Sequence, residues 1–114
     1  MLIISSECAS AADRNGNYAV WGIGARSCHT FNQSIESGAT DNYRNYIMGY
    51  LTAYNVVAQD TYRIAGDLDL DQIMAWIQDY CDLKPINSFE QALADFTAER
   101  APTRVKQAPQ PYGR

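Results

Sequence analysis

The fold is decided by the stretch from Asp41 to Ala58, which reads DNYRNYIMGYLTAYNVVA. Apolar and aromatic residues recur in it at steps of three and four, the period of a helix with one buried face. We expect a helix that has Asp41 as its N-cap and ends near Ala58. The residues on the expected buried face are Tyr43, Tyr46, Ile47, Tyr50, Leu51, Tyr54 and Val57.

Two features of this helix carry further expectations. The tyrosine row could be a binding platform, but it is more typical of a core whose hydroxyl groups reach the surface. Gly49 lies inside the helix, where glycine costs about 1 kcal/mol relative to alanine. We therefore expect another helix to cross closely at Gly49.

The flanking sequence predicts three shorter helices, within residues 27–38, 69–85 and 88–102. Each begins at a serine or aspartate that can cap it, and each ends at a glycine or a proline. Gln72 and Gln91 stand at the third position after the caps Asp69 and Ser88, as in a capping box. The expected buried faces are Cys28, Phe31 and Ile35 in the first, Leu70, Ile73, Met74, Ile77 and Cys81 in the second, and Phe89, Ala92, Leu93 and Phe96 in the third.

The segments outside these helices are expected to close the core. Tyr62 and Ile64, in the connection 59–68, would fold back as an apolar pair. Residues 18–23 would form a loop that packs Trp21 over the bundle. No segment alternates as a strand does. The sequence therefore predicts an all-α fold, a small irregular four-helix bundle with extended N- and C-terminal arms.

The composition is that of one globular domain. The chain has 114 residues, of which 46% are hydrophobic and 19% charged, and its net charge is −4. This acidic balance argues against nucleic acid or an anionic membrane as the main partner. No apolar stretch of 18 residues occurs, so we expect no transmembrane segment.

The residues that commonly carry catalysis or bind metals do not form a known constellation. His29 is the one histidine, and it follows Cys28 directly, so the two side chains would point to different sides of a helix. Asp67, Asp69 and Asp71 alternate like the start of a calcium loop, but glutamines stand where that loop needs its glycine and glutamate. We expect no catalytic residue, metal site or cofactor, and a protein that is not an enzyme.

The two ends of the chain differ from the middle, which suggests three parts: 1–25, 26–100 and 101–114. Ala9-Ser10-Ala11 is similar to the end of a secretory signal peptide, and residues 1–12 are either a remnant of one or a mature arm. The tail 101–114 is basic and rich in proline, which favours an extended conformation. It is either a solvated tail or a segment that lies along a partner.

The three cysteines divide into a pair and a single residue. Cys28 and Cys81 lie on apolar helix faces, 53 positions apart. A disulfide between them would contribute about 4 kcal/mol and is typical of small exported domains. The alternative is two buried free thiols in a cytosolic protein. Cys8 would be removed with a signal peptide, or kept for an intermolecular link or a lipid.

The order of these elements resembles the HdeA/HdeB family of small periplasmic proteins. The resemblance covers roughly residues 26–100. It rests on the short helix opening Ser27-Cys28-His29-Thr30-Phe31, the long middle helix, the aspartate-rich turn, and the helix ending Ile77-Gln78-Asp79-Tyr80-Cys81. It implies an all-helical fold, a Cys28–Cys81 disulfide and a periplasmic location. That family includes acid-stress chaperones. The phrase Met48-Gly-Tyr-Leu-Thr-Ala-Tyr-Asn55 is also similar to Tai-type periplasmic immunity proteins.

Three functions follow as hypotheses for an exported, non-enzymatic interaction protein. The favoured one is an accessory or structural subunit of a larger periplasmic or membrane-associated complex, because the chaperone members lack the basic tail and the Trp21 arm. The alternatives are an acid-stress chaperone that binds client proteins and a periplasmic immunity or inhibitor protein. The candidate partner-binding residues are Tyr18, Trp21, Arg104, Lys106, Tyr112 and Arg114.

Overall fold

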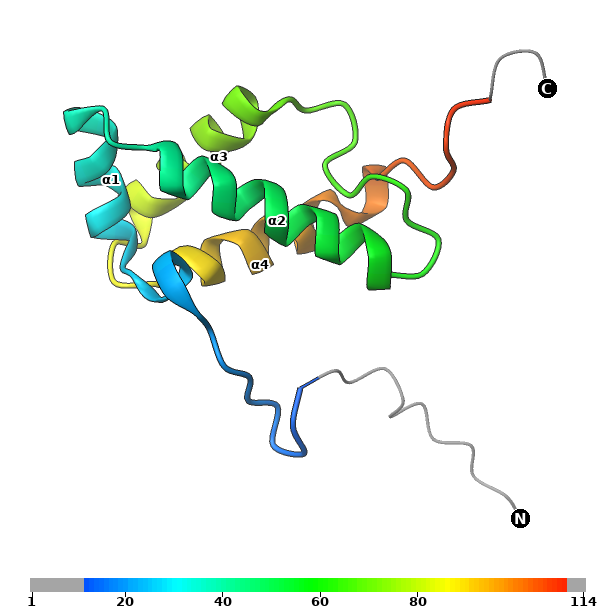
Figure 1. Ribbon diagram of the computed structural model, residues 1–114, viewed down its shortest axis with the longest axis horizontal. Coiled ribbons are helices and arrows are strands. Elements are labelled where there is room, and N and C mark those ends of the chain that lie inside the picture. The colour runs from blue at the N-terminus through cyan, green and yellow to red at the C-terminus, as the bar shows by residue number, and fades with distance from the viewer. Residues whose placement is uncertain (1–11, 111–114) are drawn as a thin grey trace.

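The computed structural model describes residues 12–110, and this part of the chain is helical, with no strand beyond two isolated bridges. Figure 1 shows the four α-helices, with α2 running across the length of the bundle. The all-α fold class is thereby confirmed. The helices are η2 (Gly22–Ala25), α1 (Cys28–Ser37), α2 (Asp41–Val57), α3 (Leu70–Leu83), α4 (Phe89–Arg100) and η3 (Ala101–Thr103).

Three of the four expected N-caps are confirmed. The Ser27 hydroxyl accepts a hydrogen bond from the Thr30 amide of α1, and Ser88 does the same for Gln91 in α4. Asp69 and Gln72 form a reciprocal capping box at the start of α3. Asp41 is different: it is the first residue of α2, whereas Thr40 is the N-cap and makes no side-chain capping bond.

The core lies between the four helices, and a cluster of rings occupies one end of it. Phe31 of α1, Tyr43 of α2 and Phe89 of α4 are mutual neighbours, with ring centroids 4.8–5.0 Å apart. Such tilted and edge-on arrangements are the favourable ones for aromatic pairs. The apolar side chains that complete the buried core are Ile47, Leu51, Ile64, Ala65, Ile73, Met74, Ile77, Ala92, Leu93 and Phe96, with Cys28 and Cys81.

Four packing expectations are wrong in part or in whole. Val57, expected on the buried face of α2, is 77% exposed. A Cβ built on Gly49 would meet nothing within 4 Å, so none of the helices in residues 12–110 crosses there. Trp21 is 84% exposed and does not pack over the bundle. Of the pair expected to fold back over the core, Ile64 is buried whereas Tyr62 remains 47% exposed.

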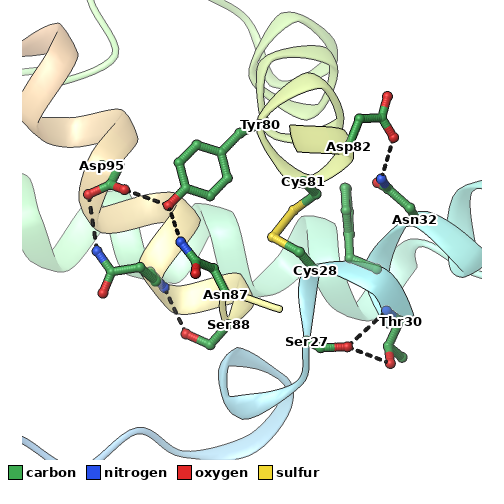
Figure 2. Close-up of a disulfide and its surroundings, with 12 residues drawn as sticks. Ser27, Cys28, Thr30, Asn32, Tyr80, Cys81, Asp82, Asn87, Ser88 and Asp95 are labelled. Carbon is green, nitrogen blue, oxygen red and sulfur yellow. Dashed lines mark hydrogen bonds between the residues drawn. A yellow bond between two sulfur atoms is a disulfide. The ribbon is translucent and has the colours of Figure 1, made fainter. Parts of the chain in front are cut away.

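The Cys28–Cys81 disulfide joins the first turn of α1 to the last turn of α3, with the two Cα atoms 4.8 Å apart. The amides of Cys28 and His29 donate to carbonyls of the α3–α4 loop, at Asn87 (2.7 Å) and Pro85 (3.0 Å). Figure 2 shows the Asn32 amide donating to the Asp82 carboxylate beside the disulfide. The start of α1 is therefore joined to the end of α3 by a covalent bond and to the α3–α4 loop by hydrogen bonds.

The first part of the expected tail folds back onto the chain. Val105 forms an antiparallel bridge with Arg63, and the Val105 carbonyl accepts from the amides of Tyr62 and Arg63. The Arg104 guanidinium donates to the carbonyls of Asp60 (2.9 Å) and Ala101 (2.7 Å). Residues 101–105 thus close the connection 59–68, whereas residues 106–110 are exposed.

Within residues 12–110, none of the helices has both the length and the apolar character needed to cross a membrane.

Candidate interaction site

The N-terminal arm, residues 12–21, enters the bundle at η2. Its first part is a compact turn in which the Asp13 carboxylate accepts from the amides of Asn15 (2.9 Å) and Asn17 (2.8 Å). Gly16 has a φ of +85°, a left-handed conformation that glycine adopts without strain. Figure 1 shows this turn standing away from the helices, joined to them by residues 18–25.

Tyr18 ties the arm to the bundle through a buried carboxylate. Its hydroxyl donates to Glu90, at 3.2 Å from Oε1 and 3.1 Å from Oε2. The hydroxyl of Tyr50, on α2, donates to Glu90 Oε2 at 3.2 Å. Glu90 is only 6% exposed and lies in the first turn of α4, where the helix dipole favours a negative charge. Three separate segments therefore meet at this one carboxylate.

A pocket of about 430 Å³, here called the arm pocket, opens beside this carboxylate. It is lined by residues 18–21 together with Tyr46, Tyr50 and Glu90. The rings of Tyr46 and Tyr50 lie one turn apart on α2, with centroids 6.1 Å apart. The arm pocket thus combines aromatic walls with a single negative charge.

Gly24 sets the position of one pocket wall. A Cβ built at this buried glycine would overlap the hydroxyl and ring atoms of Tyr46, so the ring packs directly against the backbone of η2. Only glycine leaves room for that approach. The close approach of α2 and η2 is thus made at Gly24, which was not expected from the sequence.

The charges near the pocket hydroxyls are negative. Burial raises the pKa of Tyr50 well above 10, and the Glu90 carboxylate raises it further. The same two causes raise the pKa of Tyr18 and of Tyr46, and Asp95 adds to the effect on Tyr18. The three phenols therefore stay protonated around neutral pH, and those of Tyr18 and Tyr50 donate hydrogen bonds to Glu90.

Among the four candidate partner-binding residues that the structure describes, two are brought together. Tyr18 and Trp21 both line the arm pocket. Arg104 and Lys106 follow η3, and Figure 1 shows that segment at the opposite end of the bundle from the arm. Arg104 is half-buried and bonded within the chain, whereas Lys106 is exposed. Tyr112 and Arg114 lie outside the described residues.

The candidate partner-binding residues named from the sequence do not include Tyr46, Tyr50 or Glu90, although a binding platform was one alternative for the tyrosine row. The tyrosine row divides: Tyr43 is core, as expected, whereas Tyr46 and Tyr50 are half-buried and line the arm pocket. The available signal was the spacing of four between these two residues, which places them on one helix face. Nothing in the sequence indicated that Glu90 would face the same pocket.

Of the other groups weighed as chemical sites, Cys28, Asp69 and Asp71 have structural roles. The Cys28 sulfur is buried in the disulfide, and His29 beside it is exposed. Asp69 caps α3, and Asp71 pairs with Arg44 at 2.9 Å. Among residues 12–110, no three His, Cys, Asp or Glu side chains are grouped closely enough to hold a metal ion.

Comparison of the chain with protein-family models, curated proteins and solved structures finds no match.

Proposed function

We propose that this chain is a non-enzymatic exported interaction protein that binds a protein partner at the arm pocket. The role that fits best is an accessory subunit of a larger periplasmic or membrane-associated complex. The observation that carries the proposal is the exposure of Trp21, which is 84%, next to Tyr18, which is 56% exposed. Both residues belong to an arm that hydrogen bonds attach to the bundle.

Tryptophan and tyrosine are the residue types that most often dominate binding energy at protein interfaces. A large exposed ring beside an aromatic pocket supplies apolar area together with groups that form hydrogen bonds. Because Tyr18 anchors the arm on Glu90, less ordering of the arm remains to be done when a partner binds. These features favour recognition of a partner over a role as a free tail.

An exported location is part of the proposal and rests on the cysteine pair. A buried structural disulfide persists in oxidising compartments and is rare in the cytosol. The pairing of Cys28 with Cys81 is also what the resemblance to the HdeA/HdeB family implies. The proposal therefore places the protein in the periplasm or outside the cell.

The test is co-purification of tagged wild-type chain from its native source, followed by mass spectrometry, with two variants in parallel. Trp21→Ala removes the exposed ring of the arm. Ile86→Ala is the matched control, because Ile86 is 92% exposed, lies in the α3–α4 loop and does not line the arm pocket. We expect a partner that the wild type and Ile86→Ala both retain and that Trp21→Ala loses by at least about ten-fold. Equal retention by both variants would remove the proposal.

The acid-stress chaperone is the second candidate, and a groove beside α2 favours it. This groove, of about 360 Å³, is lined mainly by apolar residues of α2, α3 and the connection 59–68, including Ile47, Leu51, Leu68 and Ile73. In acid the thirteen carboxyl groups lose their charge while nine Lys and Arg residues keep theirs, so the net charge of −4 becomes strongly positive. Repulsion would then loosen the helices and widen access to their apolar faces.

The chaperone role has its own measurement, namely light scattering of an aggregating client protein at about pH 2–3. Suppression of aggregation at a near-stoichiometric ratio is the expected result for a chaperone. Unchanged client aggregation would exclude it and would leave the partner-binding proposal in place. An immunity or inhibitor role shares the arm pocket, since that role calls for a concentrated aromatic or acidic patch. It would be recognised by loss of activity of a captured enzyme.

A further inference from the structure

The Glu90 carboxylate has acceptor capacity that its known partners do not use. Two hydroxyl groups, from Tyr18 and Tyr50, donate to it, whereas an ionised carboxylate has about four acceptor positions. Within residues 12–110, the ion pair that forms joins Arg44 to Asp71, and no lysine or arginine pairs with Glu90. Glu90, which is 6% exposed, therefore faces the arm pocket with no cationic partner among residues 12–110.

Burying a carboxylate without a cation is costly, because the charge loses its hydration. The α4 N-terminus and the two phenols offset part of this cost. The pocket beside Glu90 offers room for a positively charged group that would offset the rest. Its aromatic walls suit such a group, because the face of a tyrosine or tryptophan ring attracts cations.

We propose that the arm pocket binds a basic side chain, lysine or arginine, that the protein partner inserts between the aromatic rings to pair with Glu90. This inference rests on the proposed function and names the chemistry of the partner at the same site. The ammonium or guanidinium N–H groups donate to Glu90 and to the hydroxyl oxygens of Tyr18 and Tyr50. The alkyl part of the side chain packs along Tyr46 and residues 19–21.

Hydrogen-bond chemistry selects a basic side chain over a quaternary amine. Each tyrosine hydroxyl keeps an acceptor position after donating to Glu90, so the site presents several acceptors at short range. Lysine has three N–H donors and arginine five, whereas a quaternary ammonium has none. A quaternary amine would leave these acceptors unsatisfied when it displaces water, which costs free energy.

The test uses the full chain and defined probes. Nα-acetyl-lysine amide and Nα-acetyl-arginine amide are titrated while the amide NMR signals of Tyr18, Trp21 and Tyr50 are followed. Nα-acetyl-norleucine amide is the uncharged control, and tetramethylammonium is the quaternary one. Glu90→Gln removes the charge with little change in volume, and Glu36→Gln, at an exposed position on α1, is the matched variant.

We expect saturable shifts with the lysine and arginine amides, at least about ten-fold tighter than with the norleucine amide. The affinity should fall about ten-fold in Glu90→Gln and stay unchanged in Glu36→Gln. Tighter binding of tetramethylammonium than of both amides would overturn the assignment to a basic side chain. Equal binding of the norleucine amide, or no effect of Glu90→Gln, would overturn the role of the carboxylate.

Two further measurements keep the outcomes distinct. Circular dichroism of Glu90→Gln verifies that the bundle is folded. Tyr50→Phe removes one hydroxyl and keeps the ring, and it should also weaken the binding of the lysine and arginine amides. The proposed function is tested separately by capture with Trp21→Ala. If Trp21→Ala loses the partner while the cationic amides fail to bind wild type, the interaction role stands and this inference falls.

Discussion

Two glycines, Gly24 and Gly49, differ in the space around their Cα atoms. Gly24 has no room for a Cβ, because the Tyr46 ring occupies that space, whereas Gly49 faces open space on the exposed side of α2. The same atom added at these two positions therefore has opposite consequences. At Gly24 it displaces a ring that lines the arm pocket, and at Gly49 it only restricts the unfolded chain.

We predict that Gly24→Ala destabilises the protein by about 1–3 kcal/mol, the usual cost of overpacking. Gly49→Ala should stabilise it by up to about 1 kcal/mol, because alanine is the better helix former. Urea unfolding followed by circular dichroism measures both changes. A Gly24→Ala variant as stable as the wild type would contradict the packing of Tyr46 against Gly24.

Tyr50 makes the stability of the protein depend on pH in the alkaline range. Its pKa in the folded state lies above the usual value of 10.0, owing to burial and to the Glu90 carboxylate. The stabilisation from the protonated phenol is therefore complete below about pH 9, where the unfolded chain also keeps its proton. Above this value the unfolded chain releases the proton first, and the free energy of unfolding decreases as the pH rises.

We predict that the free energy of unfolding, measured with urea, decreases as the pH rises from about 9 to 11. The slope of this decrease gives the number of protons released on unfolding, and Tyr50→Phe should reduce it by up to about one proton per molecule. Tyr62→Phe is the matched control, since Tyr62 is exposed in the connection 59–68 and should leave the slope unchanged. An identical pH slope in wild type and Tyr50→Phe would contradict the raised pKa.

At the scale of the elements, the helices were predictable to within a few residues, and the arms were not. Helix ends depend on local chemistry, such as the Asp69–Gln72 capping box and the left-handed Gly38, and a single sequence contains these signals. The conformation of residues 101–105 depends on Arg63, about forty positions earlier. A pairing between residues so far apart leaves no pattern in the local sequence, so residues 101–105 resembled a solvated tail.

We predict that the two described basic residues of the C-terminal segment differ in importance. Arg104→Ala loses hydrogen bonds to the carbonyls of Asp60 and Ala101 and should cost about 1 kcal/mol. Lys106→Ala changes an exposed side chain and should stay within about 0.5 kcal/mol of wild type.

Amide hydrogen exchange at Tyr62 and Arg63 tests this pairing directly, since both amides donate to Val105. Exchange should become faster in Arg104→Ala and remain as in wild type in Lys106→Ala. If neither variant alters exchange at these amides, the bridge between residues 63 and 105 does not depend on Arg104.

For the whole molecule, the candidate site was less predictable than the fold. The exposed arm residues Tyr18 and Trp21 could be named from the sequence because aromatic residues before a helical domain are conspicuous. Glu90 could not, since an acid in the first turn of a helix is ordinarily a solvated residue that complements the helix dipole. Glu90 is buried because the arm, α2 and α4 contact one another around it. These contacts can be seen only in the three-dimensional structure.

The disulfide also acts on the whole molecule, because it closes a loop with a sequence separation of 53 residues. A loop of this length predicts that loss of the bond costs about 4 kcal/mol, mostly by freeing the unfolded chain. Urea midpoints of the wild type with and without reductant measure the cost. The Cys28→Ala/Cys81→Ala double variant serves as the control, since reductant should leave its midpoint unchanged. Equal midpoints for oxidised and reduced wild type would contradict this prediction.

The same bond determines how the protein would respond to a mechanical load. A pull between the arm and the C-terminal segment enters the covalent loop at Cys28 and leaves it at Cys81, so α1, α2 and most of α3 bear no tension. The residues between Cys28 and Cys81 therefore cannot be extended, and they correspond to about 180 Å of contour length at roughly 3.4 Å per residue. The segments that can extend lie outside this loop, so a partner that strains the chain would not stretch the residues between Cys28 and Cys81.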